Sequence, residues 1–507
     1  MNDEITPKQA LTLLISLLVV ALCGIVYELI IGTISSYLLG NSVYQFSITI
    51  GLFMFSMGVG SYITKHFNNQ FIENFVAVEM LIAIVGGLSG IILFTVFPFA
   101  RIFYELTMYA TIFVIGCLVG MEIPILTSLL ALQSGTKQTV ADVLSFDYLG
   151  ALIGSVAFPL LLLPSLGLLH SSFVIGLINA LVALTTLFVF RNFISKYRIY
   201  LILILIILVA LISLNIFGAF FTRFAEKHLY FDQIIFSEQT PYQKLVFTRS
   251  QNHKDHRLFI DGSIQFSSRD EYRYHEYLVH PVMSVEGVRD RVLILGGGDG
   301  LALREVLKYD AVKKIDLVDI DPRIIELGKD FSILRKLNKN SLNDPRVTVF
   351  TEDAFSFLNQ YGPKYDRVII DFPDPHNEAL SKLYSKEFYN IVRKRMNEGG
   401  AMVTQSSSPF FTRRAFWCIN STIESVFGHT LAYNIALPSF GIWGFNLSTY
   451  GTSIPDSWNI AVPTKAIRSS TMAKAIVFDS DISRVDTPVN SLFLPKLYQF
   501  YAEDIQS

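Results

Sequence analysis

The chain has 507 residues, of which 51% are hydrophobic and 17% are charged, and its formal net charge is −2. This length exceeds what one ordinary core supports and predicts two or more domains. The near-neutral charge excludes a broad nucleic-acid surface, which requires clustered lysine and arginine. Most of the apolar excess lies before about residue 222, so the two halves of the chain are interpreted separately.

Seven apolar segments precede residue 222, and each is long enough to cross a bilayer, which takes about 20 apolar residues in a helix. The first is too long, and too early in a run of similar segments, to be a cleaved signal peptide. We therefore predict a membrane domain of seven helices over residues 1–222. The segments are residues 11–34, 43–63, 75–97, 106–132, 143–163, 168–190 and 199–221.

Acidic residues interrupt these segments at Glu28, Glu79, Glu122 and Asp147. A carboxylate in lipid is costly, so each is expected to face the bundle interior or an interface. They either form a cation-attracting site or pair with polar neighbours. Pro124 predicts a break in the fourth helix, and Gly150 and Gly154 form a GxxxG pattern that favours close helix packing.

A small strand-rich subdomain is predicted next, over residues 223–285. Within it, Leu258-Phe-Ile-Asp-Gly262 and Ser263-Ile-Gln-Phe266 are typical of a hairpin with an Asp-Gly turn. Cys23, Cys117 and Cys418 show no metal-ligand spacing, so we expect small buried side chains and neither a disulfide framework nor a metal site.

From Arg291 onward, short apolar strands alternate with helices, which is typical of an α/β domain with a parallel sheet. We predict a Rossmann-like domain over residues 286–507. Its first strand ends in Gly296-Gly-Gly-Asp-Gly300, where glycines allow a sharp turn and a close approach to a ligand. The predicted strands are residues 291–295, 314–318, 346–351, 366–370 and 401–405.

Acidic residues follow successive strands at Asp319, Asp353 and Asp371. The carboxyl ends of parallel strands meet at one crevice, and Asp319 lies twenty residues after Asp299, the spacing at which an acid meets ribose hydroxyls. An acid inside the glycine loop disfavours a phosphate and favours a cationic ligand. The pattern therefore predicts a nucleoside ligand of the S-adenosyl type in preference to a nicotinamide dinucleotide.

The soluble half resembles the spermidine synthase family of aminopropyltransferases over about residues 230–450, and the N-terminal half resembles the multi-span extension of its membrane-integrated members. Ordered motifs carry this resemblance: Tyr242-Gln243, Asp261-Gly-Ser-Ile-Gln265, Asp270-Glu-Tyr-Arg-Tyr-His-Glu276, the loop 296–300 with Arg304-Glu-Val-Leu307, Asp319-Ile-Asp321, Asp344-Pro-Arg-Val347, Asp353-Ala354, Asp371-Phe-Pro-Asp-Pro375, Leu383-Tyr384, Glu387-Phe-Tyr389 and Trp443-Gly-Phe445.

The resemblance implies transfer of the aminopropyl group of decarboxylated S-adenosylmethionine, a co-substrate and not a prosthetic group, to a di- or polyamine. Methylthioadenosine is released and no metal is required. Putrescine, giving spermidine, is the first candidate acceptor. The implied catalytic pair is Asp371 and Tyr274, and Tyr274 also contacts the acceptor together with Asp374 and Gln405. The implied cofactor-binding residues are Gln243, Gln265, Gly296, Gly298, Asp299, Asp319 for the ribose hydroxyls and Asp353 for adenine.

Two segments depart from the family pattern. The family's Pro-Thr-Tyr-Pro-Ser-Gly corresponds here to Leu437-Pro-Ser-Phe-Gly441, which lacks the tyrosine of the acceptor pocket. The usual Asp-Pro-x-Gly-Pro is replaced by Asp374-Pro-His-Asn-Glu378. Another di- or polyamine therefore stays open as acceptor. We interpret Asp321 and Asp344 as surface caps or turns, and His275 and His280 as structural.

Three functions are weighed: a membrane-anchored aminopropyltransferase, an S-adenosylmethionine-dependent methyltransferase, and a polyamine transport or sensing protein. Lys8, Lys65, Lys137 and Arg191 fall on one side of a seven-helix arrangement, and by the positive-inside rule this places the catalytic domain outside the cell. A cytosolic co-substrate requires the opposite. We expect a multi-pass cell-membrane protein with a cytoplasmic catalytic domain, and a homodimer as in soluble members of the family.

Overall fold

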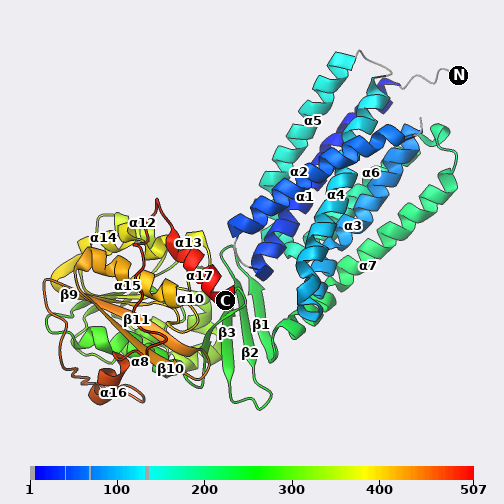
Figure 1. Cartoon of the computed structure of the whole chain (residues 1–507). Coiled ribbons are helices and arrows are strands. Elements are labelled where there is room, and N and C mark those ends of the chain that lie inside the picture. Colours follow the sequence, from blue (N-terminus) through cyan, green and yellow to red (C-terminus); the bar gives the residue numbers. More distant parts are fainter. Residues whose placement is uncertain (1–5, 40–41, 68–69, 132–135, 507) are drawn as a thin grey trace. The chain divides into compact units, whose positions relative to one another are not determined.

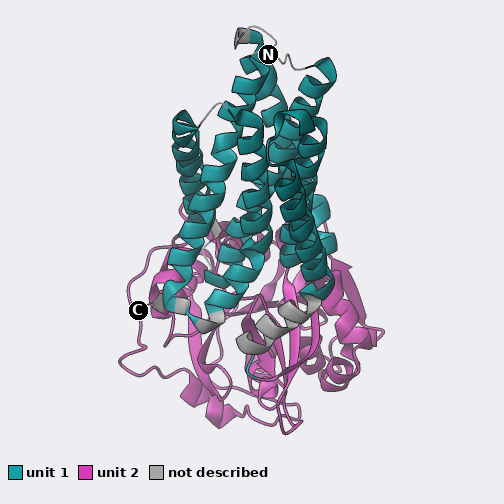
Figure 2. Cartoon of the chain, turned by 90° about the vertical axis from the view of Figure 1, so that its right-hand side faces the viewer, with its two compact units in different colours: residues 1–231 teal, residues 232–507 magenta. Residues whose placement is uncertain are grey.

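The computed structural model describes residues 6–39, 42–67, 70–131 and 136–506. The chain divides into two compact units, Met1–Phe231 and Asp232–Ser507 (Figure 2). The side chain of Lys137, one of the charges used above to predict the orientation, lies outside the described part.

Unit 1 is a bundle of long helices (Figure 1). Six stretches among the described residues are long and apolar enough to cross a membrane, against the seven predicted. The count differs because the fifth and sixth predicted segments lie in one helical run, Gln138–Val189. The helices are α1 (Pro7–Leu39), α2 (Ser42–Ile63), α3 (Phe71–Phe99), α4 (Arg101–Leu130), α5 (Thr136–Ala157), α6 (Leu163–Val189) and α7 (Tyr197–Leu229).

The run from α5 to α6 changes its geometry twice. A π-helical turn, Phe158–Leu162, joins the two helices and contains a proline at its start. Gly167 then has φ 69°, a left-handed conformation that only glycine adopts readily. The run has 52 residues, and at about 1.5 Å per residue it is more than twice as long as the ~30 Å hydrocarbon core of a bilayer. The change of direction therefore occurs at these two irregular positions.

The predicted break at Pro124 is wrong, because α4 continues through this residue to Leu130. Proline removes one backbone donor, but packed neighbouring helices and nearby hydroxyl groups commonly compensate for this loss in apolar bundles. The GxxxG positions do pack closely. A Cβ atom on Gly150 would lie 2.1 Å from the carbonyl oxygen of Leu18, so α5 and α1 approach to a distance that a larger side chain would prevent.

Three of the four acidic residues named from the sequence face the interior of the bundle: Glu28 is 8% exposed, Glu79 0% and Glu122 2%. Asn179 of α6 donates a hydrogen bond of 2.8 Å to Glu79, and the Glu79 and Glu122 carboxyl groups are hydrogen-bonded to each other. Glu79 and Glu122 therefore pair with polar neighbours inside the bundle. Asp147 is only partly buried.

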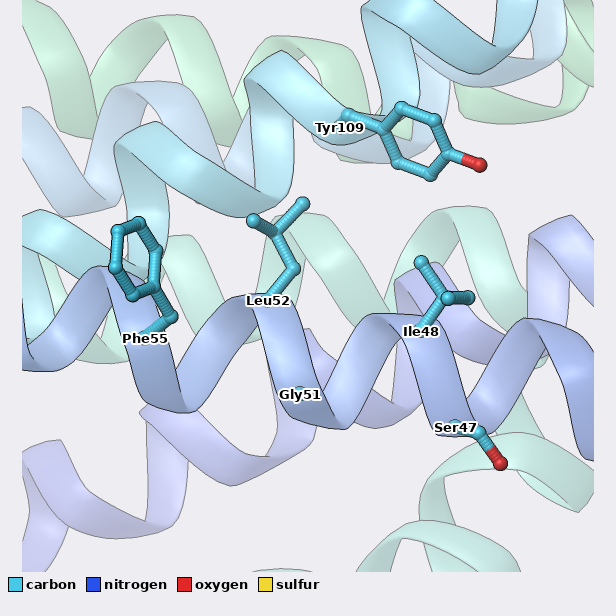
Figure 3. A pocket seen from close by; sticks show the side chains of 6 residues that line it. All are labelled: Ser47, Ile48, Gly51, Leu52, Phe55 and Tyr109. Atoms are coloured by element: carbon cyan, nitrogen blue, oxygen red, sulfur yellow. The ribbon is translucent and has the colours of Figure 1, made fainter.

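An apolar hollow of about 550 Å³ lies between α2 and α4. Figure 3 shows Ile48, Leu52 and Phe55 projecting from α2 on the side where Tyr109 of α4 lies. Ser47 and Gly51 complete the lining, which contains no charged side chain. This hollow is therefore suited to apolar chains and not to a polar substrate.

Unit 2 begins with a four-stranded antiparallel sheet in the order β1-β2-β3-β4. Its strands are β1 (Gln233–Gln239), β2 (Lys244–Arg249), β3 (His256–Ile260) and β4 (Ser263–Ser267). The predicted hairpin is present, and its turn residues Asp261 and Gly262 have φ of 48° and 81°. Phe247 and Phe266 of this sheet are buried against Ile324 and Leu334 of the helices that follow β6.

The larger sheet has seven strands in the order β10-β11-β9-β8-β5-β6-β7. β5 pairs in parallel with β6 on one side and with β8 on the other. The strand order therefore reverses between β5 and β8, because β6 and β7 extend the sheet in one direction and β8 and β9 extend it in the other. Open α/β sheets bind ligands at such a switch point. The strands are β5 (Arg291–Gly296), β6 (Lys314–Asp319), β7 (Val347–Thr351), β8 (Tyr365–Asp371), β9 (Met396–Gln405), β10 (Thr430–Leu437) and β11 (Gly441–Tyr450).

Helices cover both faces of this sheet (Figure 1). Alternate residues of β5 enter different cores: Val292 and Ile294 pack with α8 and α9, whereas Leu293 and Leu295 pack with α12, α14 and α15. The five predicted strands are all present, and the antiparallel pair β10 and β11 was not predicted. The helices are α8 (Glu271–Ser284), α9 (Leu301–Val306), α10 (Pro322–Asp330), α11 (Ser332–Leu337), α12 (Ala354–Asn359), α13 (Glu378–Ser381), α14 (Lys386–Lys394), α15 (Arg413–Phe427), α16 (Ser469–Ala475) and α17 (Lys496–Gln506).

Candidate active site

The loop between β5 and α9 brings backbone against two carboxylates. Gly296, Gly297 and Gly300 have φ of 80°, 65° and 79°, which glycine alone adopts without strain. A Cβ atom on Gly298 would lie 2.7 Å from Oδ2 of Asp319, and one on Gly297 would lie 3.3 Å from Oδ2 of Asp371. The loop therefore lies directly over the ends of β6 and β8.

Asp299 and Asp319 are held by backbone N–H groups. The N–H of Leu301 donates to Asp299 over 2.9 Å, and the N–H of Gly298 donates to Asp319 over 2.9 Å. Burial, with a smaller contribution from Asp371, raises the pKa of Asp299 to about 6, although His275 opposes the shift. Burial likewise raises the pKa of Asp319 to about 6. Neither carboxyl group forms an ion pair with a residue that the structure describes, so both are suited to a cationic ligand.

Asp371 ends β8 and accepts a hydrogen bond of 2.6 Å from the hydroxyl of Tyr274 on α8. Burial raises the pKa of Asp371, while His275 and the Tyr274 hydroxyl act in the opposite direction. A carboxylate has about four lone-pair sites. Asp371 can therefore accept the hydrogen bond from Tyr274 and still take up a proton at its other oxygen. The pair can accept a proton at a fixed position.

His275 lies closer to this site than its structural interpretation from sequence implied. Its Nδ1 is 3.0 Å from Oε2 of Glu271. Glu271 in turn forms a bidentate salt bridge with Arg304, in which both hydrogen bonds measure 2.8 Å. Burial lowers the pKa of His275, but Glu271, Asp299 and Asp371 raise it to a net value above the ordinary one. The i,i+4 spacing of Glu271 and His275 is the sequence signal that identifies this pair. His280 instead contacts Tyr309 and Glu305 in the core.

Asp374 forms the other end of the site, three residues beyond Asp371. It lies 3.0 Å from the hydroxyl of Tyr501 and 3.5 Å from Nε2 of Gln405. Burial raises the pKa of Asp374 to about 6, although these donors oppose the shift. Tyr501 was not predicted, and nothing in the local sequence connects it to a residue so far away in the chain.

The remaining predicted residues make other contacts. Gln243 donates to Asp321 over 2.9 Å, and Asp321 also caps α10 through the N–H of Arg323. Asp321 is a cap, as predicted, but it is 0% exposed. The prediction that it lies at the surface is therefore wrong, because the small sheet covers it. The Gln265 amide contacts the carbonyl of Ser263 at 3.3 Å, and no bond to a site carboxylate occurs among the described residues.

Asp353 caps α12 by accepting from the N–H of Ser356 over 2.9 Å, and it lies 3.4 Å from Nζ of Lys382. Asp344 pairs with Arg346 at a turn, as expected. The structure therefore brings together Asp299, Asp319, Asp371 and Tyr274 with the loop 296–300, and it places Asp374 and Gln405 beside them. Gln265 lies in the middle of β4 and Asp353 lies just beyond the end of β7, and both have local partners.

Comparisons with known proteins identify chains that are similar to this one. The spermine/spermidine synthase domain matches residues 271–455. The polyamine aminopropyltransferase of Leptospira interrogans serogroup Icterohaemorrhagiae serovar copenhageni is 42% identical and covers 96% of this chain and 97% of its own. Polyamine aminopropyltransferase 1 of Streptomyces coelicolor is 40% identical over 99% of this chain and 96% of its own. The crystal structure of spermidine synthase from Thermotoga maritima has a TM-score of 0.45 at 23% identity and covers 53% of this chain and 88% of its own.

These matches define an enzyme, a transferase of polyamine biosynthesis. The chain belongs to the polyamine aminopropyltransferase family, which uses decarboxylated S-adenosylmethionine, and its activity is that of a polyamine aminopropyltransferase. Because the first match covers 96% of the chain, it includes the N-terminal region of six long apolar helices, which indicates a multi-pass membrane protein. Of the three functions weighed from sequence, the comparisons select the aminopropyltransferase.

Proposed function

We propose that this chain transfers the 3-aminopropyl group of decarboxylated S-adenosylmethionine to a diamine and that putrescine, giving spermidine, is the acceptor. The observation that carries this proposal is the position of the Asp371–Tyr274 pair. The pair adjoins the glycine loop with Asp299 on one side, and Asp374 with Gln405 on the other. A cationic donor and a cationic acceptor would thus meet at a single proton-accepting carboxylate.

The donor is proposed to bind along the ends of β5, β6 and β7. Gly296, Gly298 and Asp299 would lie against its charged end, and Asp319 would accept hydrogen bonds from the ribose hydroxyls. Asp353 would bind the adenine amino group, and Gln243 and Gln265 would close the site from the small sheet. The local partners of Gln243 and Asp353 would then have to be exchanged for the ligand.

The acceptor is proposed to bind beside Asp374, Gln405 and Tyr274. An amine of pKa about 10 is almost wholly protonated at neutral pH and has no lone pair. Asp371 accepts its proton, and Tyr274 holds the carboxylate in place. The freed lone pair attacks the methylene carbon next to sulfur. A C–N bond forms, the C–S bond breaks, and the electron pair of that bond passes to sulfur, which leaves as neutral methylthioadenosine.

The test is product analysis with decarboxylated S-adenosylmethionine and a panel of amines. The wild-type protein should release methylthioadenosine only when an amine is present, and fastest with putrescine. Asp371→Asn should lower kcat about 10²–10⁴-fold, because a positioned base contributes that much. Asp344→Asn, at a turn paired with Arg346, is the matched control and should keep full activity. Equal activity of Asp371→Asn and wild type would exclude the proposed base.

We further propose the cell membrane as the location, with the catalytic unit in the cytoplasm where the co-substrate is made. The functional division is proposed to follow residues 1–222, 223–285 and 286–507, with the small sheet contributing to donor binding. A homodimer is proposed from the resemblance to soluble members of the family. Sedimentation of the detergent-solubilised protein would test this last point.

A further inference from the structure

The carboxylate of Asp374 is held from several elements. The Tyr501 hydroxyl donates to its Oδ2 over 3.0 Å, and Nε2 of Gln405 lies 3.5 Å from its Oδ1. The Ser407 side chain is also hydrogen-bonded to it. Asp374 as a whole residue is nevertheless only partly buried.

The Gln405 amide is largely committed elsewhere. Its Nε2 donates to the carbonyl of Phe372 over 2.6 Å and to the hydroxyl of Tyr384 over 2.7 Å. An amide NH₂ has two hydrogens, so its 3.5 Å contact with Asp374 is a third and weak one. The shorter hydrogen bond from Tyr501 therefore dominates the orientation of Asp374 over that from Gln405.

Tyr501 is fixed by the anchoring of its helix. Leu497, one turn earlier on the same face, is fully buried in the core of the sheet. One turn later, Asp504 accepts a hydrogen bond of 2.6 Å from Nε of Arg414 on α15. These two contacts hold α17 on both sides of Tyr501 and so fix the helix position from which the phenol reaches Asp374.

We propose that Tyr501 of α17 is a positioning residue that determines acceptor specificity: its hydroxyl orients the Asp374 carboxylate so that the free lone pairs point at the distal ammonium group of a diamine. This inference rests on the proposed role of Asp374 in binding the acceptor. Tyr501 lies beyond residue 455, where the match to the family domain ends.

The segment 437–441 supports this assignment. It carries no tyrosine, and its Phe440 packs against Tyr274 with ring centroids 6.4 Å apart. The segment therefore contributes an aromatic ring to the site but no phenol hydroxyl. The phenol hydroxyl that contacts Asp374 comes instead from Tyr501 on the C-terminal helix α17.

The experiment compares Tyr501→Phe with Tyr498→Phe in the full-length protein in detergent or nanodiscs. Both changes remove one phenol oxygen from α17, but the Tyr498 hydroxyl has no hydrogen-bond partner among the described residues. Tyr501→Phe should raise KM for the preferred diamine about tenfold, as expected for a lost hydrogen bond to a charged group. The KM for decarboxylated S-adenosylmethionine and kcat at saturating amine should stay within twofold of wild type.

The second readout is chain-length specificity. Diamines of three, four and five carbons should be discriminated less by Tyr501→Phe than by wild type, since a carboxylate without the Tyr501 hydrogen bond fixes the distal ammonium less tightly. Tyr498→Phe should match wild type in both readouts. An unchanged amine KM and unchanged length preference in Tyr501→Phe would overturn the inference, and so would an equal loss in both variants, which indicates a merely structural helix.

Calorimetric titration with putrescine separates this inference from the proposed reaction. If the wild-type protein releases no methylthioadenosine from decarboxylated S-adenosylmethionine and an amine, the proposed function is refuted. Weaker diamine binding in Tyr501→Phe but not in Tyr498→Phe would still support the positioning role, because the binding measurement requires no turnover. Equal binding by wild type and both variants would contradict it.

Discussion

The carboxyl groups of the site are strained electrostatically when no ligand is bound. Burial raises the pKa of Asp299, Asp319 and Asp374 to about 6 each. An acid whose pKa is higher in the folded state than its unfolded value of about 3.9 stabilises the folded protein at pH values below about 3.9. This stabilisation is lost as the pH rises through the folded-state pKa. At neutral pH these acids are ionised and destabilise the folded state.

Two other buried acids act in the opposite sense and in a different pH window. The pKa of Glu271 and of Glu305 is lowered to about 2: burial raises it, but partners including His275, His280 and Arg304 outweigh burial. Their stabilisation is present above the unfolded value of about 4.3 and is lost as the pH falls toward 2. Between pH 5 and 7 the three site acids titrate, so their contribution to the stability of the free protein should decrease over this range.

Activity and stability should therefore depend on pH in opposite directions. A cationic substrate requires ionised carboxylates, so kcat/KM should fall as the pH drops through about 6, while the thermal midpoint of the free protein should rise. Asp299→Asn should raise that midpoint at pH 7.5 and weaken donor binding, a common exchange between stability and function. Thermal scans and donor titrations at pH 5 and 7.5 would measure both.

The control is Asp344→Asn. The Arg346 side chain lowers the pKa of Asp344, so this acid is stabilised when ionised. Its replacement should leave donor binding unchanged and should lower the thermal midpoint slightly or not at all. A lower midpoint for Asp299→Asn at pH 7.5 would show that the Asp299 carboxylate is not strained.

At the scale of elements, α8 anchors a long C-terminal segment through one buried carboxylate. Glu276 accepts hydrogen bonds from the N–H groups of Lys465, Ala466 and Ile467 over 2.7, 2.7 and 3.1 Å. It is 1% exposed. Three donors would be left poorly satisfied without its charge, so this single side chain holds the segment that precedes α16.

Glu276→Gln should therefore lower the free energy of unfolding by about 2–3 kcal/mol, the cost of weakened hydrogen bonds to a buried charge. Denaturant titration would measure this loss, and hydrogen exchange at residues 465–467 should accelerate before the rest of unit 2 opens. Glu286→Gln, at an exposed position in the loop after α8, is the control and should change neither. Unchanged exchange at residues 465–467 in Glu276→Gln would show that other contacts hold the segment.

The strands that build the site could be predicted because they are short continuous apolar runs, such as Val292 to Leu295, followed by acids. The pair β10 and β11 was missed, since the segment 437–441 was compared with a family loop and the strands around it alternate less clearly. Pro124 was read by a rule for soluble helices, whereas packing within the bundle overrides that rule.

The site itself was predictable where its residues follow strands. Asp319 and Asp371 come together because parallel strands place their carboxyl ends at one edge. Tyr501 was not predictable, because its contact with Asp374 joins positions 127 residues apart and depends on how α17 packs on α15. His275 was interpreted as structural because sequence does not reveal that α8 lies under the glycine loop.

At the scale of the whole molecule, the orientation of the catalytic unit can be measured with a single cysteine. Cys23, Cys117 and Cys418 are all buried, whereas Tyr361 is fully exposed in the loop before β8. Tyr361→Cys should react with a membrane-impermeant maleimide in inverted vesicles and not in intact cells. Labelling in intact cells would place this unit outside the cell and contradict the proposed cytoplasmic site.

The crowding of Asp299, Asp319 and Asp371 has a consequence for the end of the catalytic cycle. These anions would attract a donor whose sulfur is positive, yet the thioether left behind is neutral at that atom. The reaction would thus remove the attraction that held the nucleoside in place. Departure of the spent nucleoside should consequently be weakly dependent on salt, whereas capture of the donor should slow markedly as ionic strength rises.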